Sequence, residues 1–330
     1  MSMDMYTKAL KLDIKKIITD SDLDGIFTAA ILKRWWPNAE VIFGHPGNLR
    51  AGMMDKIIDR NTAICDLPRH PNCGLSIDHH KSNEPAKDNL EKCVILWEKT
   101  PSAARIAYNL LKDKVDLTDL SETMMWVDKL DGGSISIEEF NGENPVLWLG
   151  RVIGSNEDVS ISILENLERR VSVQDILDLP EVKTVLDERI AKQKYLNQII
   201  KKNLIIIDRL AIARLENLNI RSNGYLVTSI AGEECDACMV IHGDVGVGFD
   251  DDERYPVSAS FYTNSFIHKA GGIFDLTNLA TSFDPDGGGH ANACGCRIKP
   301  LDNGIVTNRD VRKKDITSNI DEWLKIWSQR

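Results

Sequence analysis

The sequence lacks the features of a membrane protein, a secreted protein or a protein that coats nucleic acid. No apolar run comes near the roughly 20 residues that a membrane-spanning helix needs, and residues 1–5 have neither the basic flank nor the apolar centre of a signal peptide. The net charge is -10, so we do not expect a broad basic face that follows a long nucleic acid backbone. These absences favour a cytoplasmic protein that acts on a small anionic substrate held by metal ions.

The sequence also lacks a cysteine framework. Its seven cysteines are odd in number and are spread along 330 residues, of which 42% are hydrophobic. Such a chain can form two domains with cores of their own, so reduced thiols are expected and disulfides are not needed. Cys235 and Cys238 form a single CxxC pair without a second pair, which is weak evidence for a zinc or redox site.

What is present is an alternation of short apolar runs and helical periodicity in the first half. We predict strands at 14–19, 39–43, 62–65, 75–77 and 93–97, and helices at 25–36, at 49–59 and from a Thr100 cap and Pro101 to residue 111. This order indicates an α/β fold with a parallel sheet that has helices on both faces. In such sheets the ligand binds beyond the carboxyl ends of the strands.

Acidic residues follow three of the predicted strands. Asp20, Asp22 and Asp24 follow the first strand, Asp66 follows the third, and Asp78-His79-His80 follows the fourth. These groups should therefore meet at one edge of the sheet. Carboxylates suit Mn²⁺ or Mg²⁺, and an imidazole shifts the preference toward manganese or another transition metal. Two ions about 3.5–4 Å apart can ionise a water and neutralise phosphate oxygens, which is the two-metal route to phosphoester hydrolysis.

Two other interpretations explain part of the pattern. The segment 20–25 also opens a calcium loop of the EF-hand type, but the twelfth position of that loop needs a glutamate and is Ile31 here. The segment 22–25 resembles the nucleophile loop of haloacid-dehalogenase-type phosphatases, with a later acidic motif between 243 and 251. That interpretation leaves 78–80 unexplained.

One more acidic residue completes a family pattern. Asp128 lies near the end of a predicted helix and by itself would be an ordinary solvated residue. Together, the segment 20–25, Asp66, the segment 78–80 and Asp128 resemble the four motifs of the DHH phosphoesterase family, which is named after the tripeptide. In the second half, the segments 258–262, 275–280 and 287–291 resemble the small substrate-binding domain that accompanies this family.

The resemblance implies a domain organisation and a cofactor. We expect a parallel-sheet DHH phosphoesterase catalytic domain at 1–185, a connecting helix at 186–205 and a smaller α/β substrate-binding domain at 206–330, with the active site in the cleft between the domains. The implied cofactor is a pair of Mn²⁺ ions, with Mg²⁺ as an alternative. The implied metal ligands are Asp20, Asp22, Asp24, Asp66, His79 and Asp128, and Asp66 is the expected bridge.

The resemblance also implies roles in catalysis and substrate binding. Asp66, His79 and His80 are the expected catalytic residues, and His80 would contact the substrate phosphate or support the metal ligands. Asp78 would orient a neighbouring histidine. A glycine-rich loop would present His290 to the substrate phosphate, and the residues of that predicted substrate-binding loop are Gly287, Gly288, Gly289 and His290.

Three positions depart from the family pattern. Ile18 and Thr19 stand where many relatives have a histidine upstream of the paired aspartates, so one metal ion would have a different ligand. Tyr262 stands where many relatives have an arginine, so the substrate phosphate would lose one contact. Asp284-Pro285-Asp286 precedes the glycines, and its charge predicts that long polyanions are rejected.

Several functions remain open at this level. The substrate could be a short oligonucleotide, a nucleoside bisphosphate, a cyclic dinucleotide, polyphosphate or pyrophosphate. A single-strand exonuclease of the RecJ type is an alternative, as is a non-catalytic relative that binds a partner, although the nearly complete ligand set argues against the latter. A homodimer is compatible with the sequence. We further predict a helix at 181–203, a helix at 232–240 between strands, and a terminal helix at 317–327 whose tryptophans pack in the core.

Overall fold

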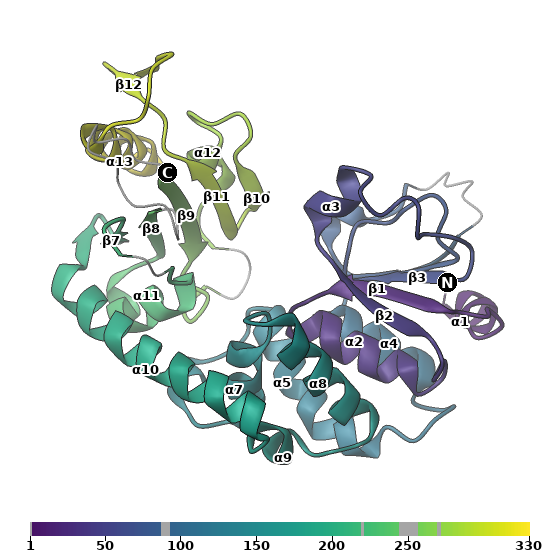
Figure 1. The fold of residues 1–330 in the computed structure, drawn as a ribbon. Coiled ribbons are helices and arrows are strands. Elements are labelled where there is room, and N and C mark those ends of the chain that lie inside the picture. The colour runs from purple at the N-terminus through teal and green to yellow at the C-terminus, as the bar shows by residue number, and fades with distance from the viewer. Residues whose placement is uncertain (1, 87–92, 219–220, 244–256, 269–271) are drawn as a thin grey trace. The chain divides into compact units, whose positions relative to one another are not determined.

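The structure is a computed structural model that describes residues 2–86, 93–218, 221–243, 257–268 and 272–330 (Figure 1). The chain divides into two compact units. The first unit comprises residues 1–134 and 139–190, and the second unit comprises residues 135–138 and 191–330. The boundary at residue 190 falls inside helix α10 (Pro180–Asn203). Within the described ranges, no helix is both long enough and apolar enough to cross a membrane.

The first unit is built on a parallel sheet of five strands in the order β2-β1-β3-β4-β5. The strands are β1 (Lys16–Asp20), β2 (Glu40–Gly44), β3 (Thr62–Cys65), β4 (Leu75–Asp78) and β5 (Val94–Trp97). Every residue of β3 and β4 is buried, as expected for central strands of a sheet that is covered on both faces. The α/β fold predicted from the alternation is confirmed.

Helices of the first unit cover the two faces of this sheet unequally. Helices α2 and α4 pack on one face, while the short helix α3 lies on the other (Figure 1). Neighbouring strand residues point to opposite faces, so Ile17 belongs to the larger core with α2 and Ile18 to the smaller core with Leu49 of α3. The helices are α1 (Ser2–Ala9), α2 (Leu23–Lys33), α3 (Pro46–Arg50), α4 (Ala103–Leu111), α5 (Ser121–Asp131), α6 (Ile137–Asn141), α7 (Pro145–Val152), α8 (Glu157–Glu168) and α9 (Val173–Leu177).

Two predicted helices of this unit differ in the structure. The helix expected at 49–59 is α3, which ends at Arg50 because Gly52 takes the left-handed conformation with φ 71°. The cap expected at Thr100 is wrong. Ser102 caps α4 instead, accepting a hydrogen bond from the backbone N of Arg105 at 3.0 Å.

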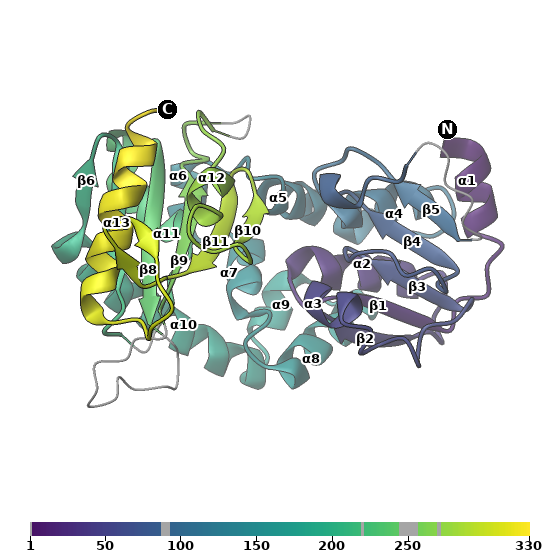
Figure 2. The same cartoon turned by 90° about the horizontal axis from the view of Figure 1, so that it is seen from above.

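The second unit has a mixed sheet of six strands in the order β10-β11-β9-β8-β7-β6. Helices α11 (Gly224–Ala231) and the end of α10 cover one face, and α12 (Thr277–Ala280) and α13 (Lys313–Trp327) cover the other (Figure 2). The strands are β6 (Ile205–Ile207), β7 (Leu210–Leu215), β8 (Ala237–Gly243), β9 (Val257–Thr263), β10 (Gly288–His290) and β11 (Ala293–Arg297), and a separate hairpin is formed by β12 (Leu301–Asp302) and β13 (Ile305–Val306).

One prediction for the second unit is wrong, and the packing of its terminal helix is confirmed. The helix expected at 232–240 lies earlier, as α11, because the Asn223 side chain caps it and accepts from the Leu226 backbone N at 3.0 Å. Residues 232–234 of the expected range form a short 3₁₀ helix, and residues 237–240 belong to the buried strand β8, since a short apolar run fits either a helix or a strand. Trp323 and Trp327 pack in the core with 0% exposure, as predicted. All seven cysteines are free thiols, which also agrees with the prediction.

Candidate metal centre

The first acidic group lies where β1 meets α2. Asp20 is the last residue of β1, and Asp22 caps α2 by accepting a hydrogen bond from the backbone N of Gly25 at 2.9 Å. A Cβ atom at Gly25 would lie 2.1 Å from the carbonyl oxygen of Asp20. Only glycine therefore lets the helix start this close to the strand. The glycine of the motif thus holds the aspartates at the carboxyl edge of the sheet.

Asp24 is fixed by a second helix. It is 1% exposed, and its carboxylate accepts hydrogen bonds from the backbone N atoms of Ala103 and Ala104, both at 2.7 Å. The carboxylate thereby satisfies two of the unpaired N–H groups at the start of α4. Burial, followed by the charges of Asp131 and Asp22, raises the pKa of Asp24 well above its usual range. A cation would remove this penalty.

Asp66 follows β3 in a conformation that is uncommon for a residue other than glycine. Its φ is 55°, and its backbone N donates to the carbonyl of Ile77 at 2.9 Å. The side chain is 4% exposed, and within the described part of the chain its Oδ1 has no hydrogen-bond partner. That oxygen lies 3.6 Å from Nε2 of His79 and 3.5 Å from Nδ1 of His80. Asp66 therefore points a buried, unsatisfied oxygen at both histidines of the tripeptide.

Asp78 positions His80. Its Oδ1 accepts hydrogen bonds from the backbone N and from Nδ1 of His80, both at 2.9 Å, and its Oδ2 accepts from Asn83 Nδ2 at 2.6 Å. Trp97 Nε1 also donates to the carbonyl of His80 at 2.9 Å. Because a carboxylate accepts, the proton of a neutral His80 ring lies on Nδ1. The Nε2 lone pair is then directed away from Asp78.

His79 is oriented from the other side. Its Nδ1 lies 3.2 Å from the carbonyl oxygen of Thr100, which can only accept, so the Nε2 atom is the one available to a ligand. Nε2 lies 3.1 Å from Oδ2 of Asp131 and 3.6 Å from Oδ2 of Asp24, yet it forms no hydrogen bond of acceptable geometry. Burial alone would lower the pKa of His79, but the carboxylates of Asp131, Asp66 and Asp24 outweigh it and raise the pKa to about 11.

These side chains fit a divalent cation. Asp66, His79 and His80 form one group, and Asp24, His79 and Asp131 form another, with the potential ligand atoms of each group within 4.8 Å of one another. Buried carboxylates are costly unless positive charge compensates them, and Asp66 Oδ1 and His79 Nε2 have no partner in the described protein. A set of oxygen and imidazole donors suits Mn²⁺ or Mg²⁺.

The structure favours Asp131 over Asp128 as a ligand. Asp128 accepts a hydrogen bond from Ser102 Oγ at 2.7 Å and from Arg105 Nε at 2.8 Å, so both of its oxygens are occupied within the fold. Asp131 lies one turn later on α5, and three residues apart is close enough for both to share a helix face. Sequence reasoning missed Asp131 because the motif contains two aspartates and nothing in the pattern distinguishes them.

Asp20 and Asp22 lie at the same edge but outside these two groups. Asp22 reaches solvent, yet the protein packed around it and the charges of Asp131 and Asp20 raise its pKa to about 6. Burial also raises the pKa of Asp20, while the nearby His45 and His80 oppose the shift. His45 follows β2 directly and so lies at the same edge of the sheet, although none of the sequence motifs includes it.

The glycine-rich segment forms a hairpin in the second unit. β10 pairs antiparallel with β11, and His290 faces Ala293 across the pair. A Cβ atom at Gly287 would lie 2.3 Å from the carbonyl oxygen of Ala280, and Gly289 has φ 138°. The hairpin therefore requires glycines for packing and backbone conformation. His290 is exposed at its end, and its role toward substrate stays a prediction.

Two departures from the family pattern have structural roles in the second unit. The ring of Tyr262 packs on Gly224 at the start of α11, where an added Cβ would lie 2.2 Å from the ring. Asp284 is 2% exposed and pairs with Arg297 at 3.2 Å and with Lys299 at 3.0 Å. The prediction that this acidic segment repels long polyanions is not supported, because its buried charge is neutralised.

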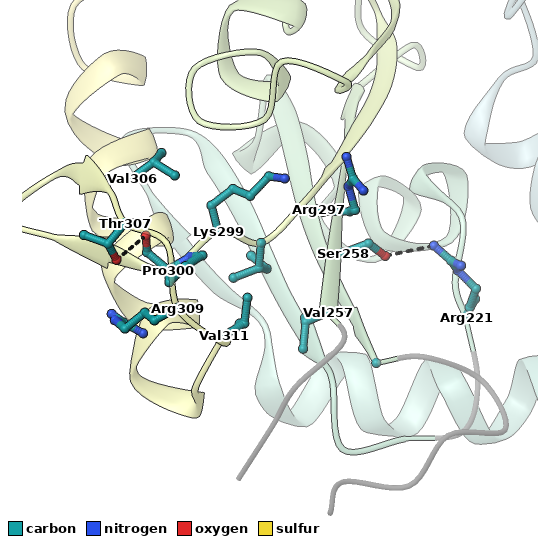
Figure 3. A pocket seen from close by; sticks show the side chains of 12 residues that line it. Arg221, Val257, Ser258, Arg297, Lys299, Pro300, Val306, Thr307, Arg309 and Val311 are labelled. Atoms are coloured by element: carbon teal, nitrogen blue, oxygen red, sulfur yellow. Dashed lines mark hydrogen bonds between the residues drawn. The ribbon is translucent and has the colours of Figure 1, made fainter. Parts of the chain in front are cut away.

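A hollow of about 600 Å³ also lies in the second unit (Figure 3). Ser258 lines it and pairs with Arg297 of β11, while His290 pairs with Ala293 of the same strand. The hollow and His290 are therefore four residues apart along β11. Three of the four cations around it are paired with carboxylates, Arg297 and Lys299 with Asp284 and Arg309 with Asp315. Those cations are Arg221, Arg297, Lys299 and Arg309.

Comparison with known proteins relates the chain by structure only, since no family model and no curated protein matches its sequence. The pGpG-specific phosphodiesterase PggH from Vibrio cholerae is similar with a TM-score of 0.72 and 19% identity, over 94% of this chain and 97% of PggH. RecJ from Thermus thermophilus in complex with Mn²⁺ is similar with a TM-score of 0.55 and 11% identity, over 98% of this chain but 54% of RecJ. CDC45 from Entamoeba histolytica has a TM-score of 0.50 and 10% identity, over 98% of this chain and 97% of CDC45.

These comparisons show the fold of the protein. The parallel sheet with acidic residues and histidines at its carboxyl edge is an α/β fold shared with phosphodiesterase and nuclease structures. PggH and RecJ are DHH family members, so the chain has the fold of the DHH phosphoesterases. The resemblance stated from the motifs is confirmed at the level of fold. At these identities, activity does not follow from the likeness.

Proposed function

We propose that this protein is a metal-dependent phosphohydrolase whose candidate metal centre holds two divalent cations, Mn²⁺ or Mg²⁺. The observation that carries the proposal is the pair of buried, unpartnered atoms at the centre, Asp66 Oδ1 and His79 Nε2, which face each other 3.6 Å apart among further carboxylates. The structures of Thermus thermophilus RecJ in complex with Mn²⁺ or Mg²⁺ support this choice of ions.

The proposal gives each residue of the centre a task. His79 Nε2 can ligate one ion, with Asp24 and Asp131 as neighbours. Asp66 would bridge to a second ion, and Asp22 and Asp20 remain as further carboxylates at the edge of the sheet. The orientation of these ligands is set by the fold, since α4 holds Asp24 and the carbonyl of Thr100 holds the His79 ring.

The chemistry follows from these tasks. When bound, the cations ionise a water and neutralise charge on the phosphoryl oxygens. Asp78 keeps the proton of a neutral His80 on Nδ1 and fixes the ring, so His80 can support a cation or contact the substrate phosphate through Nε2. Asp24 and Asp66 are buried, so bulk water screens their charges only weakly. Their electrostatic interactions with a cation are correspondingly stronger.

The proposed substrate is a phosphoester or phosphoanhydride of small or short size. The net charge of -10 argues against tracking a long polyanion. The likeness to PggH extends over 97% of that protein, whereas the likeness to RecJ covers 54% of RecJ. We therefore favour a short substrate over the alternative of a RecJ-type exonuclease. His290 of the second unit is the proposed phosphate contact there, and a binding protein without catalysis is the remaining alternative.

A hydrolysis panel tests the proposal. The purified protein with Mn²⁺ is offered pGpG, a nucleoside bisphosphate, a cyclic dinucleotide, pyrophosphate, polyphosphate and single strands of several lengths, with Asp66→Ala as the blank. We expect hydrolysis that needs the metal, is absent in Asp66→Ala and prefers short substrates. Equal rates for wild type and Asp66→Ala would refute the site, and processive degradation of long strands would refute the substrate class.

A further inference from the structure

We propose that His45 is a substrate-binding residue, which donates a hydrogen bond from Nε2 to a phosphoryl oxygen of the substrate. The inference rests on the proposed phosphohydrolase function and adds a residue to that site. His45 belongs to none of the sequence motifs discussed above. Its case depends on its position, on the state of its two ring nitrogens and on a comparison with another histidine of the first unit.

His45 lies at the carboxyl edge of the sheet beside the metal centre. β2 pairs in parallel with β1, and the register places Gly44 opposite Asp20. His45 is the next residue, so it leaves the sheet alongside the segment that carries Asp22 and Asp24. Its side chain is exposed and lies near the Asp20 carboxylate. A ligand bound beyond the strand ends would therefore meet this side chain.

The local structure settles which nitrogen can donate. Nδ1 of His45 accepts a hydrogen bond from the backbone N of Gly47 at 3.1 Å, so Nδ1 carries no proton and a neutral ring carries it on Nε2. Neither nitrogen then offers a free lone pair to a metal ion. This agrees with the absence of His45 from both groups of potential metal ligands among the described residues. The remaining capacity of the ring is a donor, which suits a phosphate oxygen.

The ring is held in place by its neighbours. Pro46 restricts the preceding residue to extended conformations, and His45 has φ -135° and ψ 144°. A Cβ atom at Gly47 would lie 3.2 Å from Nδ1, so the glycine leaves room for this close contact. Capping alone does not need an imidazole, because Asn, Asp and Ser cap helices at least as well. The second nitrogen is the feature that a histidine adds.

His70 of the first unit accepts the same local hydrogen bond through Nδ1, but its Nε2 lies near a carboxylate. Its Nδ1 accepts from the backbone N of Asn72 at 3.1 Å, but its Nε2 lies 3.3 Å from Oδ1 of Asp55. For His45, the described part of the chain places no carboxylate within ion-pair distance. His70 is therefore a matched control, since replacing it disturbs a similar turn and leaves the proposed donor in place.

Two replacements separate the roles of the two nitrogens. Asparagine places a polar atom near the position of Nδ1, so His45→Asn keeps the cap and loses the donor. Glutamine places its amide nitrogen near the position of Nε2, so His45→Gln keeps a donor and loses the cap. With pGpG and pyrophosphate as probes and Mn²⁺ present, we expect His45→Asn to raise KM about tenfold with little change in kcat, as for the loss of a hydrogen bond to a charged group. His45→Gln should stay closer to the wild-type KM and melt at a lower temperature.

The controls make each failure distinct. Mn²⁺ titration should be the same for wild type and His45→Asn, and His70→Asn should leave KM unchanged. An unchanged KM in His45→Asn, while wild type is active and Asp66→Ala is not, overturns the role of His45 and leaves the hydrolase function standing. Loss of Mn²⁺ binding in His45→Asn, or an equal rise of KM in His70→Asn, also overturns it. Wild-type protein that hydrolyses neither the two probes nor any other substrate of the panel overturns both proposals.

Discussion

Oδ1 of Asp66 and Nε2 of His79 lie 3.6 Å apart in the protein interior, and neither atom has a hydrogen-bond partner among the described residues. Both atoms are held there by the backbone. Asp66 adopts a left-handed φ of 55° immediately after β3, and the carbonyl of Thr100 fixes the His79 ring. The fold therefore maintains two unsatisfied polar atoms in a place where it could have buried apolar ones, which is the signature of a site that binds something positive.

Replacing Asp66 by asparagine should separate stability from activity. Asparagine tolerates the left-handed conformation and removes a buried negative charge, whose pKa is raised first by burial and then by the charge of Asp24. We expect metal-free Asp66→Asn to melt at a higher temperature than metal-free wild type. With Mn²⁺, its hydrolysis should fall more than about a hundredfold, since loss of a supporting partner alone costs 10- to 100-fold. Calorimetry and initial rates measure the two effects, and a melting point below that of wild type would contradict the charge argument.

Asp131→Asn should mainly weaken Mn²⁺ binding, whereas Asp128→Asn should mainly lower the free energy of unfolding. Asp131→Asn removes a carboxylate 3.1 Å from His79 Nε2, so it should weaken Mn²⁺ binding and lower the rate. Asp128→Asn disrupts the contacts with Arg105 and Ser102 and should cost about 1–2 kcal/mol of unfolding free energy, with Mn²⁺ affinity changed much less. Titration with Mn²⁺ and urea unfolding of both variants show which of the two aspartates is the metal ligand. A larger loss of Mn²⁺ affinity in Asp128→Asn would restore the assignment made from the sequence.

His242 should make the second unit sensitive to acid. Burial and the charge of Arg221 lower the pKa of His242 from 6.5 to about 4, and its buried Nδ1 has no hydrogen-bond partner in the ranges that the structure describes. The unfolded chain therefore binds a proton more readily, so the stability from this residue is complete above about pH 6.5 and is lost as the pH falls toward 4. The free energy of unfolding should fall less steeply between pH 7 and about 4.5 in His242→Gln than in wild type. Parallel pH profiles for the two proteins would contradict this.

Asp284 should contribute to stability and not to substrate choice. Although burial opposes it, Arg297 and Lys299 hold the pKa of Asp284 well below its usual range. Asp284→Asn leaves Lys299 without this carboxylate and Arg297 with Asp286 alone, and should cost about 1.5–3 kcal/mol of unfolding free energy. The neighbouring Asp286 is exposed, with 80% of its side chain accessible, so Asp286→Asn is the matched control with little expected effect. Faster cleavage of long polyphosphate by Asp284→Asn would revive the idea that this segment repels long polyanions.

The sequence predicts the strands and the acidic residues that follow them, but it does not predict features that depend on side-chain packing. The strands and the Asp20, Asp66 and Asp78 positions could be located because apolar runs end at acidic residues at the same edge of the sheet. The preference for Asp131 over Asp128, which stays a prediction, could not be derived from the sequence, because it rests on Arg105 pairing with one of two residues on the same helix face. The sequence does not distinguish the buried strand β8 from a helix, because its short apolar run has neither helical nor alternating periodicity.

The central claim is that the buried acidic centre binds divalent cations through Asp66 and His79. Calorimetric titration of metal-free protein with Mn²⁺ tests it most directly, since it requires no knowledge of the substrate. We expect wild type to bind two Mn²⁺ ions and His79→Ala to lose at least one of them, with both proteins folded by circular dichroism. Wild-type protein that binds no Mn²⁺, or a His79→Ala variant that binds it with unchanged affinity and stoichiometry, would contradict the account.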